Sequence, residues 1–190
     1  FFWWFGGLAP GVARPDGVGP EGSAHPVPAP RHEGTFADEE PPRTESYDEA
    51  DVSDKPDLVQ RTPLNPGDEA YIARYYRAEL ESLLAVDEAV EAIVDTLDRT
   101  GQLDDTVIVF TSDNGLFHGE HRLRTGKFFL YEPAVRVPLL VRGGPFTAGT
   151  SVDAPVGNVD LAPTLLALAG AVPAGSVLDG RDLAPLVSDP

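Results

Sequence analysis

Residues 67–100 place apolar side chains three or four positions apart, which is the period of a helix with one face toward a core. We expect Asp68, which follows Gly67, to cap this helix, and Gly101 to end it. The predicted apolar stripe comprises Leu80, Leu83, Leu84, Val86, Val90, Ile93, Val94 and Leu97. The acidic residues expected to face mostly outward are Glu81, Glu88, Glu91, Asp95 and Asp98.

The apolar pattern then changes from helical to extended. Thr106–Thr111 is a largely β-branched run whose central residues, Val107–Phe110, are apolar throughout, which predicts a strand buried on both faces of a sheet covered by helices. Arg136–Arg142 predicts a second strand, at an edge or with an irregular start because of Pro138. Asp160–Leu168 predicts a short helix ended by Gly170. This order predicts an α/β fold with a mixed, largely parallel sheet flanked by helices, of which these residues form an incomplete portion.

The rest of the chain has little regular patterning. Residues 1–34 are dominated by Gly, Pro and Ala and predict an irregular segment. Its first five residues, Phe1–Phe5, are too few to span a bilayer, and we interpret them as the end of a strand from a longer chain. Residues 35–66 are predicted to form an exposed acidic loop, and residues 67–190 the α/β portion. No repeat is visible, and nothing predicts an oligomeric state.

The charge balance limits the partners that the chain can bind. Fourteen Lys and Arg against 31 Asp and Glu give a net charge of −17, which repels phosphate backbones and disfavours nucleic acid as a partner. An anionic substrate would need a bound cation and local basic groups to reverse this field. The chain has no cysteine, so disulfides, thiolate metal sites and cysteine nucleophiles are excluded within it.

Candidate chemistry begins where the first predicted strand ends. Asp113 and Asn114 stand side by side there, before Gly115, which lets the backbone turn close to a ligand. Ligands of open α/β sheets bind at the carboxyl ends of strands, and hard oxygen donors suit Ca²⁺ or Mg²⁺. The alternative is an ordinary loop turn in which these side chains bond to their own backbone.

Two further features have a candidate role and a structural alternative. His118 and His121 have the spacing of a zinc pair on a helix, but the glycine between them argues against a helix there. Asp160 is expected to cap the short helix rather than to act as a catalytic acid.

Several segments, in order, resemble the formylglycine-dependent sulfatases of the alkaline phosphatase superfamily. DNG alone is a weak signal, whereas DNG, GEH, GK and YE before RVPLL together are specific. Asp51–Pro56 (DVSDKP) resembles a segment of the N-acetylglucosamine-6-sulfatases, so we expect relatives among these and the arylsulfatases. The other matching segments are Phe110–Gly115 (FTSDNG), Gly119–Lys127 (GEHRLRTGK), Tyr131-Glu132, Arg136–Gly143 (RVPLLVRG) and Asn158–Gly170 (NVDLAPTLLALAG).

The resemblance implies an alkaline phosphatase-like fold, of which residues 1–190 are the C-terminal portion of the catalytic domain, and a sulfuric ester hydrolase activity. Asp113 and Asn114 would be ligands of Ca²⁺, with Mg²⁺ as the alternative ion. Lys127 would hold a sulfate oxygen and stabilise charge developing in the transition state. His121 would support the pocket wall, and His25 is the nearest candidate for a histidine that binds sulfate or protonates the leaving group. The implied substrate is a sulfated small molecule or sugar, and the implied location is extracytoplasmic.

The chain also departs from the family pattern. It contains neither the C/S-x-P-x-R sequence that yields the formylglycine nucleophile nor the early pair of acidic metal ligands. A Ca²⁺ ion takes about six or more oxygen ligands, so Asp113 and Asn114 alone would make half of a site. We therefore expect this chain alone to be inactive. Two alternatives remain: a phosphate or phosphonate monoester hydrolase of the same superfamily, and a catalytically dead truncated remnant.

Overall fold

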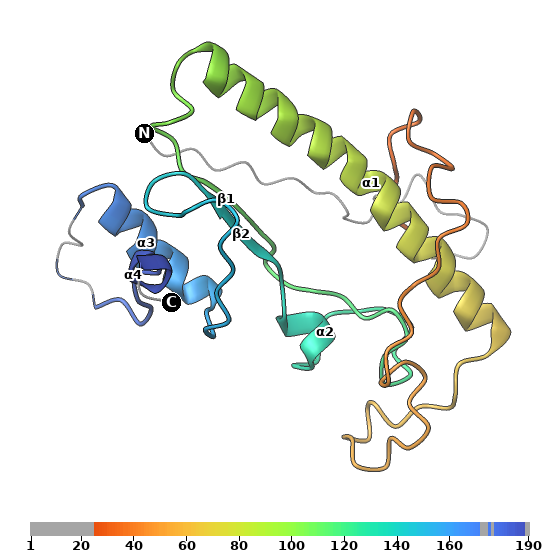
Figure 1. Cartoon of the computed structure of the whole chain (residues 1–190). Helices are drawn as coiled ribbons and strands as arrows, with labels where there is room; N and C mark the ends of the chain where they lie inside the picture. Colours follow the sequence, from red (N-terminus) through yellow and green to blue (C-terminus); the bar gives the residue numbers. More distant parts are fainter. Residues whose placement is uncertain (1–24, 172–174, 176, 189–190) are drawn as a thin grey trace. The chain divides into compact units, whose positions relative to one another are not determined.

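The computed structural model describes residues 25–171, 175 and 177–188 (Figure 1). The run Phe1–Phe5 and most of the predicted irregular segment 1–34 lie outside the described residues. The chain divides into two compact units, one of residues up to Ile93 with Asn114–Arg136, the other of Val94–Asp113 with the residues from Val137 onward. The elements are α1 (Pro66–Arg99), β1 (Ile108–Thr111), α2 (Glu132–Val135), β2 (Leu139–Arg142), the 3₁₀ turn η2 (Asn158–Asp160), α3 (Leu161–Leu168) and α4 (Ala184–Ser188). No helix in the described part of the chain is long and apolar enough to cross a membrane.

The first turn of α1 is capped by a residue other than the predicted one. Asn65 Oδ1 accepts hydrogen bonds from the backbone N–H groups of Gly67 (2.8 Å) and Asp68 (3.1 Å), and Asp68 Oδ2 accepts from the Asn65 N–H (3.2 Å). The prediction that Asp68 is the N-cap is therefore wrong. Pro66 takes the first helical position, which its fixed φ favours, so the cap lies before it and Asp68 completes a capping box. At the other end, Gly101 has φ +66°, as predicted for the residue that stops the helix.

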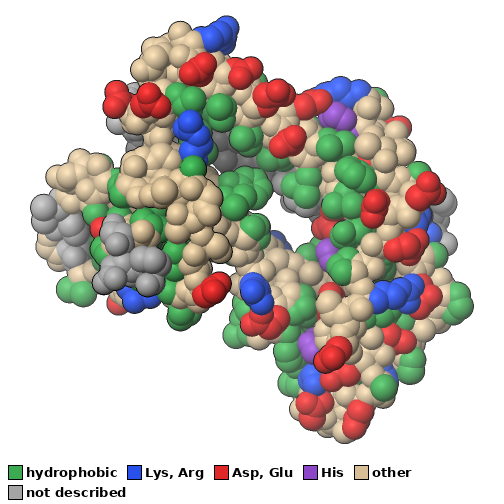
Figure 2. Space-filling view, in the orientation of Figure 1, with side chains coloured by type: hydrophobic (Ala, Val, Ile, Leu, Met, Phe, Trp, Pro, Cys, Tyr) green, Lys and Arg blue, Asp and Glu red, His purple; other side chains and the backbone are tan. Residues whose placement is uncertain are grey.

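The N-terminal half of α1 is its better buried part. Tyr71, Ile72 and Tyr75 are buried there, whereas Leu83 and Val90 of the predicted stripe remain 36% and 37% exposed. The earlier part of the segment before α1, which includes Gly34 and Glu39, lies against this half of the helix (Figure 1). Acidic side chains stand along the exposed side of α1 (Figure 2).

Glu81 departs from the outward orientation that the pattern predicts. Its side chain is buried, and Oε1 accepts hydrogen bonds from the backbone N–H groups of Gly34 (2.8 Å) and Phe36 (3.4 Å). Helical periodicity cannot anticipate this burial, because the donors come from a segment 45 or more residues away. A buried carboxylate is tolerated where such donors replace water.

The segment between residues 35 and 65 contains turns but no helix or strand. Val52 and Val59 in this segment are nevertheless buried, at 7% and 0% exposure. Val59 packs in one cluster with Phe117, Leu123 and Ala134. The acidic segment is thereby held against residues 114–136, which carry the candidate site.

The second unit contains the two strands, the turn η2 and the helices α3 and α4. Strand β1 pairs antiparallel with β2, with Ile108 opposite Arg142 and Thr111 opposite Leu139. β2 begins directly after Pro138, as the irregular start predicted for this strand requires. β1 is only partly buried, and Phe110 is 39% exposed, so the predicted burial on both faces is not met. The reason is that, among the described residues, only β2 is hydrogen-bonded to it as a strand.

The Asp160 side chain bonds to the backbone of Arg181, near the end of the described residues, instead of capping α3. Asp160 occupies the position before α3, but its side chain bonds no N–H of the helix. Its carboxylate accepts from the N–H groups of Gly157 and Arg181, both at 2.9 Å, which lowers the pKa of Asp160 below its usual value, chiefly through the Arg181 bond. Thr164, buried on α3, accepts from the Leu183 N–H at 2.9 Å.

Candidate functional site

The structure joins two of the predicted site residues. Lys127 Nζ donates a hydrogen bond to Asn114 Oδ1 at 2.9 Å. Asn114 Nδ2 donates to the Gly115 carbonyl oxygen, also at 2.9 Å, which points the amide oxygen toward the ammonium group. Asn114 of the DNG segment and Lys127 of the GK segment therefore lie side by side.

A small core brings Lys127 back to Asn114. Between them the chain loops around Phe117, which is completely buried, and Leu123, which is 4% exposed. The Phe117 N–H donates to the Gly126 carbonyl at 3.0 Å and closes the loop next to Lys127. Phe129 and Tyr131 pack against the same core. The apolar residues of this loop thus position its two polar ends.

Packing against α2 requires glycine at position 115. A Cβ at this position would lie 2.1 Å from the carbonyl oxygen of Pro133 in α2, a distance that no real Cβ tolerates. The Gly115 N–H donates to the Ala134 carbonyl at 2.8 Å. Glycine therefore lets the segment lie directly on α2, which fixes the residue next to Asn114.

His121 is held by a carboxylate from the acidic segment. Its Nδ1 lies 2.6 Å from Glu49 Oε2, and its ring lies 4.4 Å from the Tyr131 ring between centroids. The hydrogen bond to His121 is the largest cause that lowers the pKa of Glu49. Lys55 Nζ pairs with Glu49 Oε1 at 3.2 Å and with Asp54 at 2.8 Å. His121 is thus part of the packed wall of the loop.

Arg122 was not identified from the sequence. Its guanidinium donates to the carbonyl oxygens of Glu49 (2.9 Å), Ala50 (2.8 Å) and Arg61 (2.7 Å). His121 and Arg122 both have positive φ, +52° and +61°, which non-glycine residues seldom adopt. Two consecutive left-handed residues turn the histidine and the arginine toward the acidic segment, and no glycine in the sequence marks this turn.

His25 and His118 lie against α1. The His25 ring is 4.9 Å from Tyr71 and 5.9 Å from Tyr75 between centroids. His118 Nε2 pairs with Glu79, and its ring meets Tyr76 edge-on at 5.4 Å. His118 and His121 therefore have different carboxylate partners. The His25 ring thus packs against two tyrosines of α1, and its role toward a leaving group stays a prediction.

Replacement of His25 by Phe is expected to flatten the pH dependence of stability. The pKa of His25 lies below its usual 6.5, first because of burial and then because of Arg74 and Arg124. The unfolded chain therefore binds more protons at acidic pH. The stability contribution is complete above about pH 6.5 and is lost as the pH falls through the folded-state pKa. Urea unfolding between about pH 7 and pH 5 measures this slope, and equal slopes in the wild type and His25→Phe would contradict the assignment.

The donor atoms at Asp113 and Asn114 fit part of a hard-cation site. The Asp113 side chain is exposed, and the Asn114 oxygen already faces a cation, the ammonium of Lys127. Both are oxygen donors of the kind that Ca²⁺ and Mg²⁺ prefer. In the part of the chain that the structure describes, no three His, Asp or Glu side chains cluster as a metal site would need. The chemistry of these two side chains suits a hard cation, and their role as its ligands stays a prediction.

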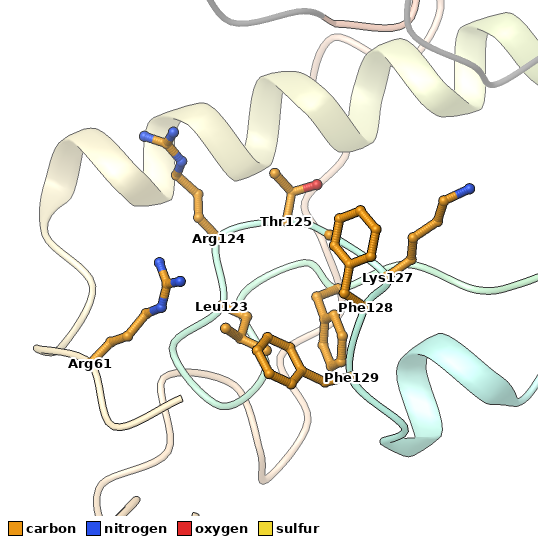
Figure 3. A pocket seen from close by; sticks show the side chains of 9 residues that line it. Arg61, Leu123, Arg124, Thr125, Lys127, Phe128 and Phe129 are labelled. Carbon is orange, nitrogen blue, oxygen red and sulfur yellow. The ribbon is translucent and has the colours of Figure 1, made fainter. Parts of the chain in front are cut away.

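A pocket of about 210 Å³ adjoins Lys127 (Figure 3). Its wall is made by the loop itself and by Arg61 from the acidic segment. Three cationic side chains line it, whereas none of its lining residues is acidic. Sequence reasoning did not identify Arg61 or Arg124. The lining residues are Arg61, Phe117, Leu123, Arg124, Thr125, Gly126, Lys127, Phe128 and Phe129.

Several known sulfatases are similar to this chain in sequence. The chain is 40% identical over 174 residues to an arylsulfatase of Volvox carteri, which covers 86% of this chain and 27% of that protein. It is 39% identical to an extracellular sulfatase SULF-1 homolog of Drosophila melanogaster, covering 89% of this chain and 15% of that protein. It is 34% identical to the human N-acetylglucosamine-6-sulfatase, covering 84% of this chain and 29% of that protein. The chain thus spans less than a third of the length of these relatives.

Two solved structures are similar over about two thirds of the chain. One is the protein BT4656 in complex with its substrate D-glucosamine-2-N,6-O-disulfate. The TM-score is 0.57 and the identity 39%, and the match covers 62% of this chain and 24% of that one. The other is a phosphonate monoester hydrolase from Silicibacter pomeroyi, with a TM-score of 0.58, 35% identity, and coverage of 66% and 24%. The structural neighbours have the predicted alkaline phosphatase-like fold. The family model for sulfatases matches residues 22–171, so the chain belongs to the sulfatase family.

Proposed function

We propose that the gene product containing these residues hydrolyses sulfate esters, and that this chain supplies one side of the metal and sulfate site. The observation that carries the proposal is the 2.9 Å contact between Lys127 Nζ and Asn114 Oδ1. It places a cationic group and a hard oxygen donor together in a chain of net charge −17, where an anion needs local positive charge to bind.

Each residue has a distinct role in this proposal. Asp113 and Asn114 hold the divalent cation of the sulfatase family, here proposed to be Ca²⁺ because both donors are hard oxygens. When bound, the cation supplies electrostatic stabilisation of the sulfuryl oxygens. Lys127 donates to a sulfate oxygen and opposes the charge that develops in the transition state. His121, fixed by Glu49, keeps the loop that carries Lys127 in place, and His25 remains the candidate that protonates the leaving alcohol.

The proposed substrate is a sulfated sugar or aryl sulfate. The names of the relatives and the disulfated glucosamine bound to one solved neighbour support this class. The family nucleophile, formylglycine, is expected from residues outside these 190, since none of them forms the C/S-x-P-x-R sequence. An extracytoplasmic location is proposed from the relative named an extracellular sulfatase.

The competing reaction is hydrolysis of phosphonate or phosphate monoesters, which the similarity to a phosphonate monoester hydrolase favours. Rates of the gene product on matched aryl sulfate, aryl phosphate and aryl phosphonate esters separate the two. We expect kcat/KM to be at least about tenfold higher for the sulfate, or about 1.4 kcal/mol of transition-state free energy. Preference for the phosphonate would replace the proposal.

A catalytically dead remnant makes a different prediction. It would turn over none of the three esters, and Ca²⁺ would not raise its melting temperature, because stabilisation by a ligand requires binding to the folded state. An active sulfatase is stabilised by Ca²⁺ in the same assay.

A further inference from the structure

The pocket beside Lys127 combines a charge pattern and a shape that the proposed sulfate site does not use. Arg61 and Arg124 line it together with Lys127, although the chain as a whole has more than twice as many acidic as basic residues. Neither Asp nor Glu is among its lining residues. In a strongly acidic protein, a concave surface lined only by cationic, apolar and neutral groups is a local reversal of the field, which concentrates anions.

The two arginines differ in how far they are already engaged. The Arg124 guanidinium lies 4.2 Å from the centre of the Tyr71 ring, and its Nη1 is 3.5 Å from Asp68 Oδ1. Arg61 forms no ion pair within 4.0 Å with any described carboxylate, and its Nε makes only a long bond of 3.4 Å to the Leu58 carbonyl. The Arg61 guanidinium is therefore more available to bind an anion, whereas the Arg124 guanidinium is held in one orientation by Tyr71 and Asp68.

The position of Arg61 is nevertheless fixed at its backbone. Its carbonyl oxygen accepts the 2.7 Å bond from Arg122, and its N–H donates to the Val59 carbonyl at 2.7 Å. Val59 is itself completely buried. An available guanidinium on a fixed backbone can bind an oxyanion with less loss of freedom than one on a mobile loop.

The rest of the wall is apolar. Phe128 is 89% exposed although it is a large hydrophobic residue, and Phe129 packs against the loop core. In Figure 3 the rings of Phe128 and Phe129 lie on one side, Arg61 and Arg124 lie on the other, and the Arg124 guanidinium extends toward α1. Apolar walls with a few directed polar groups are typical of sites for small organic molecules.

We infer that Arg61 and Arg124 form a second anion subsite, which binds a second sulfate or a carboxylate of the same substrate. This inference rests on the proposed function. It narrows the substrate to a sugar that carries a second negative group besides the scissile sulfate. Arginine suits this role because its planar fork can make two parallel bonds to an oxyanion.

Equilibrium binding tests the subsite without requiring turnover. Titration calorimetry of the gene product would use D-glucosamine-2-N,6-O-disulfate and D-glucosamine-6-sulfate as probes. We expect the wild type to bind the disulfate about tenfold more tightly than the monosulfate, which is the gain typical of one charge-assisted hydrogen bond. This preference should decrease as the salt concentration rises. Arg61→Gln should remove most of this preference, Arg61→Lys should retain part of it, and Arg124→Gln should reduce it.

Arg136→Gln is the matched control, because Arg136 is an exposed arginine of the same unit, with an 83% exposed side chain, outside the pocket. An unchanged preference in Arg61→Gln, or an equal loss in Arg136→Gln, would overturn the subsite, as would equal binding of both probes by the wild type. Should Arg61→Gln fail to fold, the salt dependence in Arg61→Lys and Arg124→Gln decides the question. The two proposals fail separately: an inactive wild type that keeps the binding preference rejects only the sulfatase activity, whereas an active one without the preference rejects only the subsite.

Discussion

Replacing Lys127 by Met is expected to lower kcat/KM for an aryl sulfate by about 10²- to 10³-fold, the loss typical of removing one group that stabilises transition-state charge. The ammonium of Lys127 lies 2.9 Å from Asn114 Oδ1, at the meeting point of the two matched segments. With a net charge of −17 on the chain, no diffuse positive field can replace it. The effect should appear in kcat as well as in KM, because the charge grows during the reaction.

The same variant should leave Ca²⁺ binding intact or strengthen it. Lys127 occupies the neighbourhood of Asn114 Oδ1 as a competing cation, so its removal frees this oxygen for a metal. Asp113→Ala should behave differently and lose both activity and Ca²⁺ affinity, because it removes a ligand. Calcium titration followed by calorimetry separates the two variants.

Arg136→Met is a suitable control for the loss of one positive charge, since Arg136 is exposed and pairs only at 3.7 Å with Glu132. If Lys127→Met retained activity within about twofold of this control, Lys127 would be an ordinary surface lysine, which is what lysines most often are.

The periodic parts of the fold could be predicted because local pattern decides them. The long helix, the strand before Asp113 and the strand after Pro138 all follow from the spacing of apolar residues and from proline. The errors lie where distant segments intervene. Glu81 is buried because Gly34 supplies an N–H, and Asn65 rather than Asp68 caps α1 because Pro66 sets where the helix begins.

The candidate site also contains residues that the sequence could predict and residues that it could not. Asn114 and Lys127 were expected in one site because both lie in motifs that the family resemblance joins, whereas the hydrogen bond between them is seen only in the structure. Arg122 and Arg61 could not be predicted, because their roles depend on a left-handed turn at two non-glycine residues and on carbonyl oxygens about 60 to 70 residues away. Such partners have no signature in local sequence.

Arg122→Ala is expected to destabilise the fold by about 2–3 kcal/mol, which is roughly 1 kcal/mol for each of three bonds to a partly exposed guanidinium. These bonds run to the carbonyl oxygens of Glu49, Ala50 and Arg61, so one side chain holds the acidic segment against the loop that carries Lys127. Urea unfolding measures the loss as a lower midpoint at unchanged m-value.

Two further variants separate the bonds from the backbone conformation. Arg122→Lys keeps the charge, but one ammonium group cannot bond to three carbonyl oxygens as the planar guanidinium does. This variant should therefore lose most of the free energy of unfolding that Arg122→Ala loses. Arg122→Gly loses the bonds but adopts φ +61° without strain, so it should be more stable than Arg122→Ala by up to about 1 kcal/mol. Arg136→Ala, at an exposed arginine of α2's C-cap, should change stability by less than about 0.5 kcal/mol.

Loss of the Arg122 hydrogen bonds should also weaken substrate binding at the candidate site. Because Arg122 fixes the Arg61 carbonyl and belongs to the loop closed by the Phe117 bond to Gly126, its removal should raise KM for the disulfated sugar more than for an aryl monosulfate. If Arg122→Ala unfolded at the same urea concentration as Arg136→Ala, the three bonds would contribute nothing measurable. The acidic segment would then be held by Val59 in the core and by bonds such as that between His121 and Glu49.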